Sequence, residues 1–173
     1  EGTVLLKNEN NTLPLTQPKV NIFGWGASDN GFLYQGGGSS EGGYSGDKIS
    51  FYQAFRDAGF QINEDLATAY NNLTYRYIGA PDQDQWSTYY RLYEADSSFY
   101  TEERMNQAKE FSDTAIVVLS RRATEGDDLP KCQYDQNGTE DDSRTYLTLS
   151  DREALLISEV TANFDKVIVC FNT

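Results

Sequence analysis

Segment 120–130 carries the side chains of this sequence that are best suited to proton transfer. Glu125 and Gly126 follow Arg121 and Arg122, and an apolar run comes directly before the segment. A carboxyl group held just beyond a buried strand, near cations and a flexible glycine, is a common arrangement for a general acid or base. A solvated acidic loop is the alternative, and the residue types alone leave both interpretations open.

A second unusual segment, 29–46, contains seven glycines, of which residues 36–38 are consecutive and precede Ser39. A phosphate-binding P-loop would need a Lys after the glycines, and no Lys stands at that spacing. The dinucleotide fingerprint also fails, because the three glycines begin too far beyond the preceding strand. Consecutive glycines instead favour a loop whose backbone closely approaches another surface or a neutral ligand.

Metal ligation has little support. The sequence has no His, which excludes His-based triads and His-ligated metals supplied by this chain. Cys132 and Cys170 lack a metal-type spacing, so we expect two thiols. A calcium site could draw on five nearby carboxylates, but their spacing does not match the known calcium loop. These are Asp127, Asp128, Asp135, Asp141 and Asp142.

Three apolar runs predict buried parallel strands over 20–25, 114–120 and 166–171, and a shorter run over 60–63 follows Gly59, which would end a helix. Helices are predicted over 47–58, 64–78, 102–111 and 150–164. In the first predicted helix, Asp47 is the expected N-cap and Ile49 lies on the apolar face. In the last predicted helix, Ser150 and Glu153 form a capping-box pattern at the start. The alternation predicts a doubly wound α/β fold, which places ligands at the carboxyl ends of its strands.

Composition excludes several classes of function. Acidic residues outnumber basic ones by 27 to 14 in 173 residues, and no Lys/Arg run exceeds two, so we expect no nucleic-acid partner. No apolar stretch approaches the roughly 20 residues that cross a bilayer, so we expect no membrane partner. The first residues lack both a signal-peptide pattern and an initiator Met, which fits an internal or processed segment.

Several motifs occur in the order found in one enzyme family. They are the opening EGTVLLKNENNTLPL, the strand ending at Phe23-Gly24, the loop 36–39, the run 115–121 leading to 124–128, and the stretches 147–153 and 167–172. Together they cover essentially the whole chain. The sequence resembles the second domain of glycoside hydrolase family 3, the β-glucosidase and β-xylosidase group.

The resemblance implies a three-layer α/β sandwich with a mostly parallel sheet, incomplete in this fragment. The family's acid/base position falls on Glu125, and we expect Ser39, Gly38 and Arg121 to bind substrate. The family joins this domain to a barrel that carries an Asp nucleophile. The implied activity is retaining hydrolysis of terminal β-D-glucosyl residues from β-linked oligosaccharides or aryl glucosides, with no metal or organic cofactor. Burial by the sugar and nearby acidic charge would keep the acid protonated.

This sequence departs from the family at Thr124, where Gly is usual, and at Leu129, where Arg is usual. The second change removes a possible ion pair with Asp127, which Arg121 or Arg122 would have to replace.

We interpret residues 1–173 as part of the sandwich domain, with a lead-in over 1–18 and an aromatic-rich insertion over 79–101. The insertion's aromatic residues could stack on sugars or pack against another domain. A barrel of about 250 residues cannot fit within this length, so we expect the fragment to be inactive alone. The alternative is a non-catalytic carbohydrate-binding or interaction module; a nucleotide-binding domain rests on fold analogy alone. Bacterial cytoplasmic and secreted locations both stay open.

Overall fold

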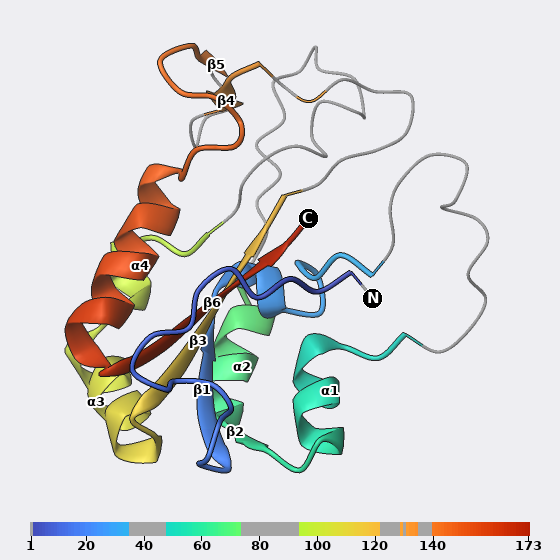
Figure 1. The fold of residues 1–173 in the computed structure, drawn as a ribbon. Coiled ribbons are helices and arrows are strands. Elements are labelled where there is room, and N and C mark those ends of the chain that lie inside the picture. The colour runs from blue at the N-terminus through green and yellow to red at the C-terminus, as the bar shows by residue number, and fades with distance from the viewer. Residues whose placement is uncertain (1, 35–47, 74–93, 122–128, 130, 135–139) are drawn as a thin grey trace.

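The main sheet has four strands, which are all parallel and lie in the order β2-β1-β3-β6 (Figure 1). A computed structural model describes residues 2–34, 48–73, 94–121, 129, 131–134 and 140–173. The strands are β1 (Lys19–Phe23), β2 (Gln61–Ile62), β3 (Thr114–Ser120) and β6 (Lys166–Asn172). β3 pairs with β6 along its full length, from Thr114 opposite Lys166 to Ser120 opposite Asn172. The predicted parallel strands are therefore confirmed, with ends that differ by at most two residues, but the predicted burial of the run 166–171 is wrong because Val169 and Phe171 of β6 are exposed.

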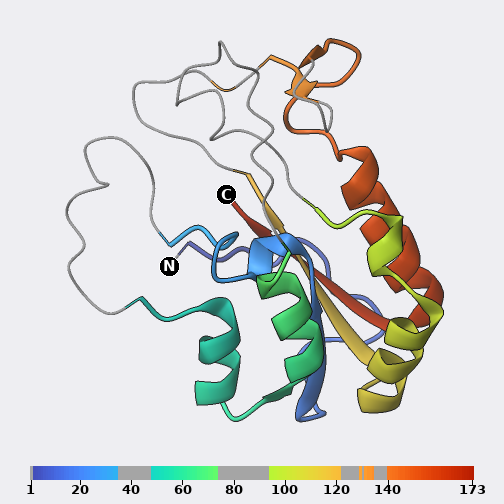
Figure 2. The ribbon, with the colours of Figure 1, turned by 180° about the vertical axis from the view of Figure 1, so that it is seen from behind.

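Helices cover both faces of this sheet. They are α1 (Phe51–Asp57), α2 (Glu64–Asn71), α3 (Glu102–Phe111) and α4 (Asp151–Asn163). α3 and α4 lie together on one side of the sheet and α1 lies on the other, as the opposite views in Figures 1 and 2 show. This arrangement confirms the three-layer α/β fold. Strands covered on both faces need apolar residues at successive positions, which explains the uninterrupted apolar run of β3.

Two buried clusters fill the spaces on either side of the sheet. Val117 of β3 lies in the cluster beneath α3 and α4, whereas the next residue, Val118, lies in the cluster that includes Tyr52 of α1. Successive strand residues point to opposite faces, so one strand supplies both clusters. Phe99 and Tyr100 also lie in the first cluster, at 6% and 8% exposure. These two aromatic residues of segment 79–101 are therefore core residues.

The first helix is shorter than predicted. α1 begins at Phe51, and the Ser50 side chain accepts a hydrogen bond from the backbone N–H of Gln53. Ser50 is extended (φ −68°, ψ 159°) and is itself the N-cap, so the expectation that Asp47 caps this helix is wrong. Ile49, which was expected on the apolar face, precedes the helix and is 57% exposed.

The predictions for the other three helices are confirmed in whole or in part. α3 matches its predicted range, and α4 has the predicted capping box between Ser150 and Glu153. α2 ends at Asn71, earlier than predicted; residues 74–78 of that prediction lie outside the described residues. Gly59 has φ +88° and follows α1, as a helix-ending glycine should.

A small hairpin lies beyond the carboxyl ends of β3 and β6 (Figure 1). Its strands are β4 (Gln133–Tyr134) and β5 (Glu140–Asp141), which pair antiparallel. Strands of two residues are too short to show an alternating pattern, so the sequence did not indicate them. None of the described helices combines the length and apolar character that a bilayer crossing requires.

Candidate functional site

The two segments singled out in the sequence both leave the sheet at its carboxyl edge. Segment 35–47 follows the chain that continues from β1, and segment 122–128 follows Arg121 at the end of β3. Glu125, Gly38 and Ser39 lie outside the described residues. The structure does describe Arg121 and the chain at the start of both segments, so it defines how this edge of the sheet is built.

Two glycines allow the chain after β1 to lie directly on β3. Gly24 has φ +99°, and a Cβ there would overlap the backbone oxygen of Val118. A Cβ on Gly26 would lie 2.7 Å from both that oxygen and the side-chain oxygen of Ser120. Because real Cβ atoms essentially never approach other atoms so closely, any other residue at either position would push the chain away from β3.

Asn172, the last residue of β6, connects the starts of both segments. Its side-chain Oδ1 accepts a hydrogen bond from Leu33 N at 2.7 Å, and its Nδ2 donates to Leu33 O at 3.3 Å. Its backbone oxygen accepts from Arg121 N at 2.9 Å. Nearby, the Ser120 hydroxyl donates to Gly31 O at 3.3 Å. The ends of β3 and β6 therefore hold the chain that leads into segment 35–47.

Arg121 points toward the N-terminus of α4. Its guanidinium donates to both carboxylate oxygens of Glu153, at 2.6 and 2.9 Å, and to the backbone oxygens of Thr148 and Ser120. Both side chains of this ion pair are nearly buried, at 7% and 3% exposure. Of the guanidinium nitrogens, the buried Nε has no hydrogen-bond partner among the described residues. Arg121 could therefore bind a substrate only if some of these hydrogen bonds were broken.

Glu94 is a buried acid at the same edge of the sheet. Its carboxylate accepts hydrogen bonds from Trp25 N at 2.8 Å and from Ala95 N at 2.7 Å, and its backbone oxygen accepts from Arg152. Burial raises the pKa of Glu94 to about 7, although these N–H donors oppose the shift. The carboxyl group thus ties the chain leaving β1 to the chain entering α3.

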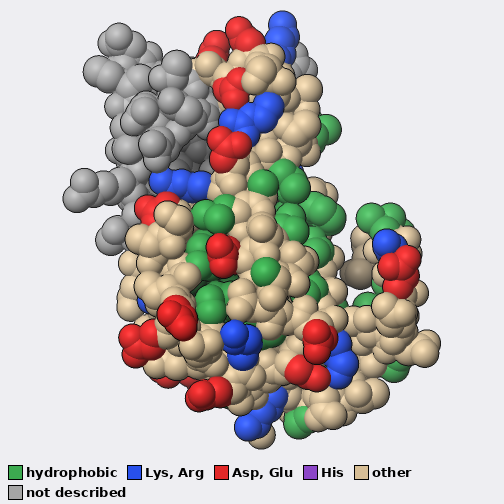
Figure 3. Space-filling model, turned by 90° about the vertical axis from the view of Figure 1, so that its left-hand side faces the viewer, with side chains coloured by type: hydrophobic (Ala, Val, Ile, Leu, Met, Phe, Trp, Pro, Cys, Tyr) green, Lys and Arg blue, Asp and Glu red, His purple; other side chains and the backbone are tan. Residues whose placement is uncertain are grey.

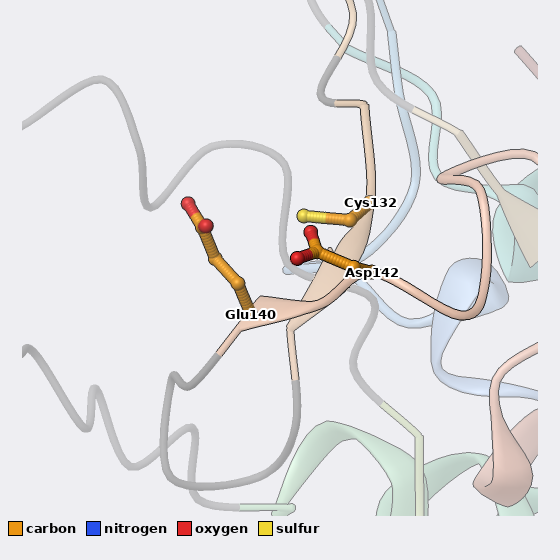
Figure 4. Close-up of side chains that lie close together, drawn as sticks. All are labelled: Cys132, Glu140 and Asp142. Carbon is orange, nitrogen blue, oxygen red and sulfur yellow. The ribbon is translucent and has the colours of Figure 1, made fainter.

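One described group of side chains has ligand atoms close enough to hold a metal ion. The atoms of Cys132, Glu140 and Asp142 lie within 4.8 Å of one another (Figure 4). Cys132 precedes β4 and Asp142 follows β5, and both belong to the hairpin. Burial and the two neighbouring carboxylates raise the pKa of the Cys132 thiol, so it is protonated at neutral pH. A metal would have to displace that proton. Cys132 and Cys170 are both free thiols, as expected.

The described surface carries charges of both signs. Figure 3 shows acidic and basic side chains interspersed on the face formed by α3 and α4. With an overall charge of −13, this surface favours no polyanionic ligand.

Sequence reasoning missed Asn172 and Glu94 as residues that build this edge. A signal for Asn172 was present, since a polar residue directly follows the apolar run 166–171 at a carboxyl strand end. Glu94 carried no such signal, because it belongs to no regular element and its partner Trp25 is 69 residues away.

Known proteins resemble this chain along nearly all of its length. A curated relative, β-glucosidase A of Butyrivibrio fibrisolvens, is 27% identical over 99% of this chain and 21% of its own. A solved β-glucosidase of Paenibacillus barengoltzii has a TM-score of 0.70 and 28% identity, over 98% of this chain and 17% of that one. β-Glucosidase 3B of Thermotoga neapolitana, solved with α-D-glucose, has a TM-score of 0.65 and 26% identity, over 98% and 22% of the two chains.

The chain spans about a fifth of the length of these relatives. The model of the glycosyl hydrolase family 3 C-terminal domain matches residues 3–173. The fold and this match agree: the chain belongs to glycosyl hydrolase family 3, and residues 3–173 correspond to its C-terminal domain.

Proposed function

We propose that this chain is the part of a retaining β-glucosidase that supplies the general acid/base, Glu125. The observation that carries the proposal is that the described chain leading into each of the two candidate segments lies at the same edge of the sheet. Arg121, which precedes the Glu125 segment, and Leu33, which precedes the Gly38–Ser39 segment, both bond to Asn172. An acid/base residue and sugar-binding groups must lie around the same glycosidic bond, and this topology lets them do so.

In the proposed reaction, Glu125 protonates the glycosidic oxygen as the bond to the sugar breaks. A nucleophilic carboxylate from a barrel domain forms the glycosyl-enzyme, and Glu125 then removes a proton from the water that releases the sugar. Ser39 and Gly38 contact the sugar. Arg121, held by Glu153, anchors the start of the Glu125 segment and stands beside the substrate.

The domain assignment is also part of the proposal. Residues 1–173 form part of the sandwich domain, with the lead-in over 1–18 and the insertion over 79–101. The barrel lies elsewhere in a longer protein, because the chain covers only about a fifth of each similar β-glucosidase. Its substrates are β-linked oligosaccharides or aryl glucosides.

The test is the Glu125→Ala variant of the full-length protein. Loss of the acid should lower kcat/KM on cellobiose by about 10²–10⁴-fold, because its leaving group needs protonation. Turnover of 2,4-dinitrophenyl β-glucoside, whose leaving group departs without a proton, should stop at the glycosyl-enzyme, and azide should restore it by forming β-glucosyl azide. Glu110→Ala, which removes an exposed carboxylate of α3, is the matched control. Cellobiose hydrolysis at the wild-type rate in Glu125→Ala would exclude the assignment.

A further inference from the structure

The Asn172 side chain forms with Leu33 the pair of hydrogen bonds that a neighbouring strand would form. A primary amide presents one acceptor and donor groups in a plane, as a peptide group does. Oδ1 accepts from Leu33 N at 2.7 Å and Nδ2 donates to Leu33 O at 3.3 Å, so both backbone groups of Leu33 are satisfied. Leu33 belongs to no strand, and these partners are 139 residues apart in sequence. The contact therefore joins two segments that local structure would not bring together.

The backbone of Asn172 has a separate partner. Its carbonyl accepts from Arg121 N at 2.9 Å, which continues the ladder between β3 and β6 by one residue. The side chain of Asn172 thus holds the start of one segment, and its backbone holds the start of the other. A side-chain substitution removes the first contact and leaves the second in place.

We propose that Asn172 is a positioning residue that holds Leu33, and with it the chain entering the Gly38–Ser39 segment, beside the end of β3 that leads into the Glu125 segment. This inference rests on the proposed function. Asn172 itself contacts neither substrate nor the reacting atoms in this role. It fixes the point from which the sugar-binding segment leaves the sheet, while β3 and β6 fix the point from which the acid/base segment leaves.

The proposal predicts that a change at Asn172 weakens substrate binding and leaves acid catalysis unaffected. In the full-length protein, Asn172→Ala should raise KM for cellobiose about tenfold, because the two hydrogen bonds that hold Leu33, at the entry to the sugar-binding segment, are lost. The ratio of kcat for 2,4-dinitrophenyl β-glucoside to kcat for cellobiose should stay as in the wild type, since Arg121 keeps its backbone bond. Asn172→Asp retains the acceptor for Leu33 N and loses the donor, so its KM should rise less.

Asn71 provides a matched control. Its Oδ1 accepts from Asp29 N at 3.0 Å and its Nδ2 donates to Asp29 Oδ2, so it ties the same stretch of chain to α2 without contacting β6. Asn71→Ala should lose comparable stability and keep the wild-type KM. An equal rise of KM in Asn71→Ala would reduce Asn172 to a general structural role and overturn the proposal.

Hydrogen exchange of the same full-length variants supplies a readout that needs no activity. Asn172→Ala should speed exchange at Leu33 N–H about tenfold, whereas Asn71→Ala should act at Asp29 N–H. Unchanged exchange at Leu33, or a kcat ratio shifted as in Glu125→Ala, would contradict the positioning role. If Glu125→Ala keeps full activity while Asn172→Ala shows both expected effects, the acid/base assignment fails and the positioning role stands.

Discussion

Glu94 is buried, and this burial is the main factor that disfavours its charged form. Glu153 adds repulsion, whereas the two backbone N–H donors and the Tyr100 hydroxyl, which donates to Oε1 at 3.5 Å, favour the charged form without supplying a counter-charge. The nearby Arg152 donates to the Glu94 backbone oxygen. Desolvation is the largest cause of the raised pKa of about 7, so the folded protein favours the protonated form more than the unfolded chain does.

This shift sets a pH dependence of stability. The folded state binds the proton of Glu94 more tightly, so the free energy of unfolding should fall as pH rises from about 4.5 to about 7 and then level off. The loss should reach on the order of 3 kcal/mol, since each pKa unit corresponds to about 1.4 kcal/mol. Urea unfolding of the wild type at pH 5.0 and 7.5 measures it.

Glu94→Gln supplies the control for that measurement. The neutral amide should remove the fall in stability between pH 5.0 and 7.5. It has one oxygen where two now accept from Trp25 N and Ala95 N, so the variant should be less stable than the wild type at pH 5.0. A wild-type slope that persists in Glu94→Gln would assign the pH dependence to another group.

At the scale of elements, the N-terminus of α4 is where the helix and the end of β3 are joined. Glu153 accepts from Ser150 N within the capping box and from the guanidinium of Arg121. One carboxylate therefore serves both the start of a helix and a buried cation. Its loss should cost more than the loss of the cap alone, because an unpaired buried charge is left behind.

Two substitutions separate these contributions. Ser150→Ala removes the cap and should lower the free energy of unfolding by about 1 kcal/mol. Glu153→Gln keeps a side-chain acceptor for the capping box but leaves Arg121 without its counter-charge, which should cost about 3–5 kcal/mol. Glu159→Gln, a change of the same kind at a half-buried position of the same helix, is the control. Equal losses in Ser150→Ala and Glu153→Gln would show that the ion pair contributes little.

Helices and strands that are determined by residues close together in the sequence could be predicted from it. The apolar run of β3 encodes burial on both faces, and the Ser150–Glu153 box marks the start of α4 within four residues. The bonds that build the candidate site are different, since Asn172 reaches Leu33 across 139 residues. No periodic pattern reports a contact of that kind, and the roles of Glu125 and Ser39 came from family resemblance.

At the scale of the whole molecule, the proposed function gives this chain one of the two carboxyl groups that a retaining glycosidase needs. We expect the isolated chain to show no turnover of 2,4-dinitrophenyl β-glucoside, because the proposed mechanism takes its nucleophile from a barrel domain outside these residues. The full-length protein, assayed at the same molar concentration, should hydrolyse it. Turnover by the isolated chain that Glu125→Ala abolishes would mean that a nucleophile lies within the 173 residues.

β6 has a further consequence for the behaviour of the isolated chain in solution. Among the described strands, β6 has a neighbour on one side only, and Val169 and Phe171 on it are 40% and 58% exposed. An unpaired strand edge with apolar side chains is a template for self-association.

The charge of −13 opposes that association at low ionic strength, and salt screens the repulsion. Light scattering should therefore show the isolated chain associating as NaCl is raised, and Phe171→Lys should suppress it. Salt usually weakens contacts between oppositely charged proteins, but here it would promote self-association.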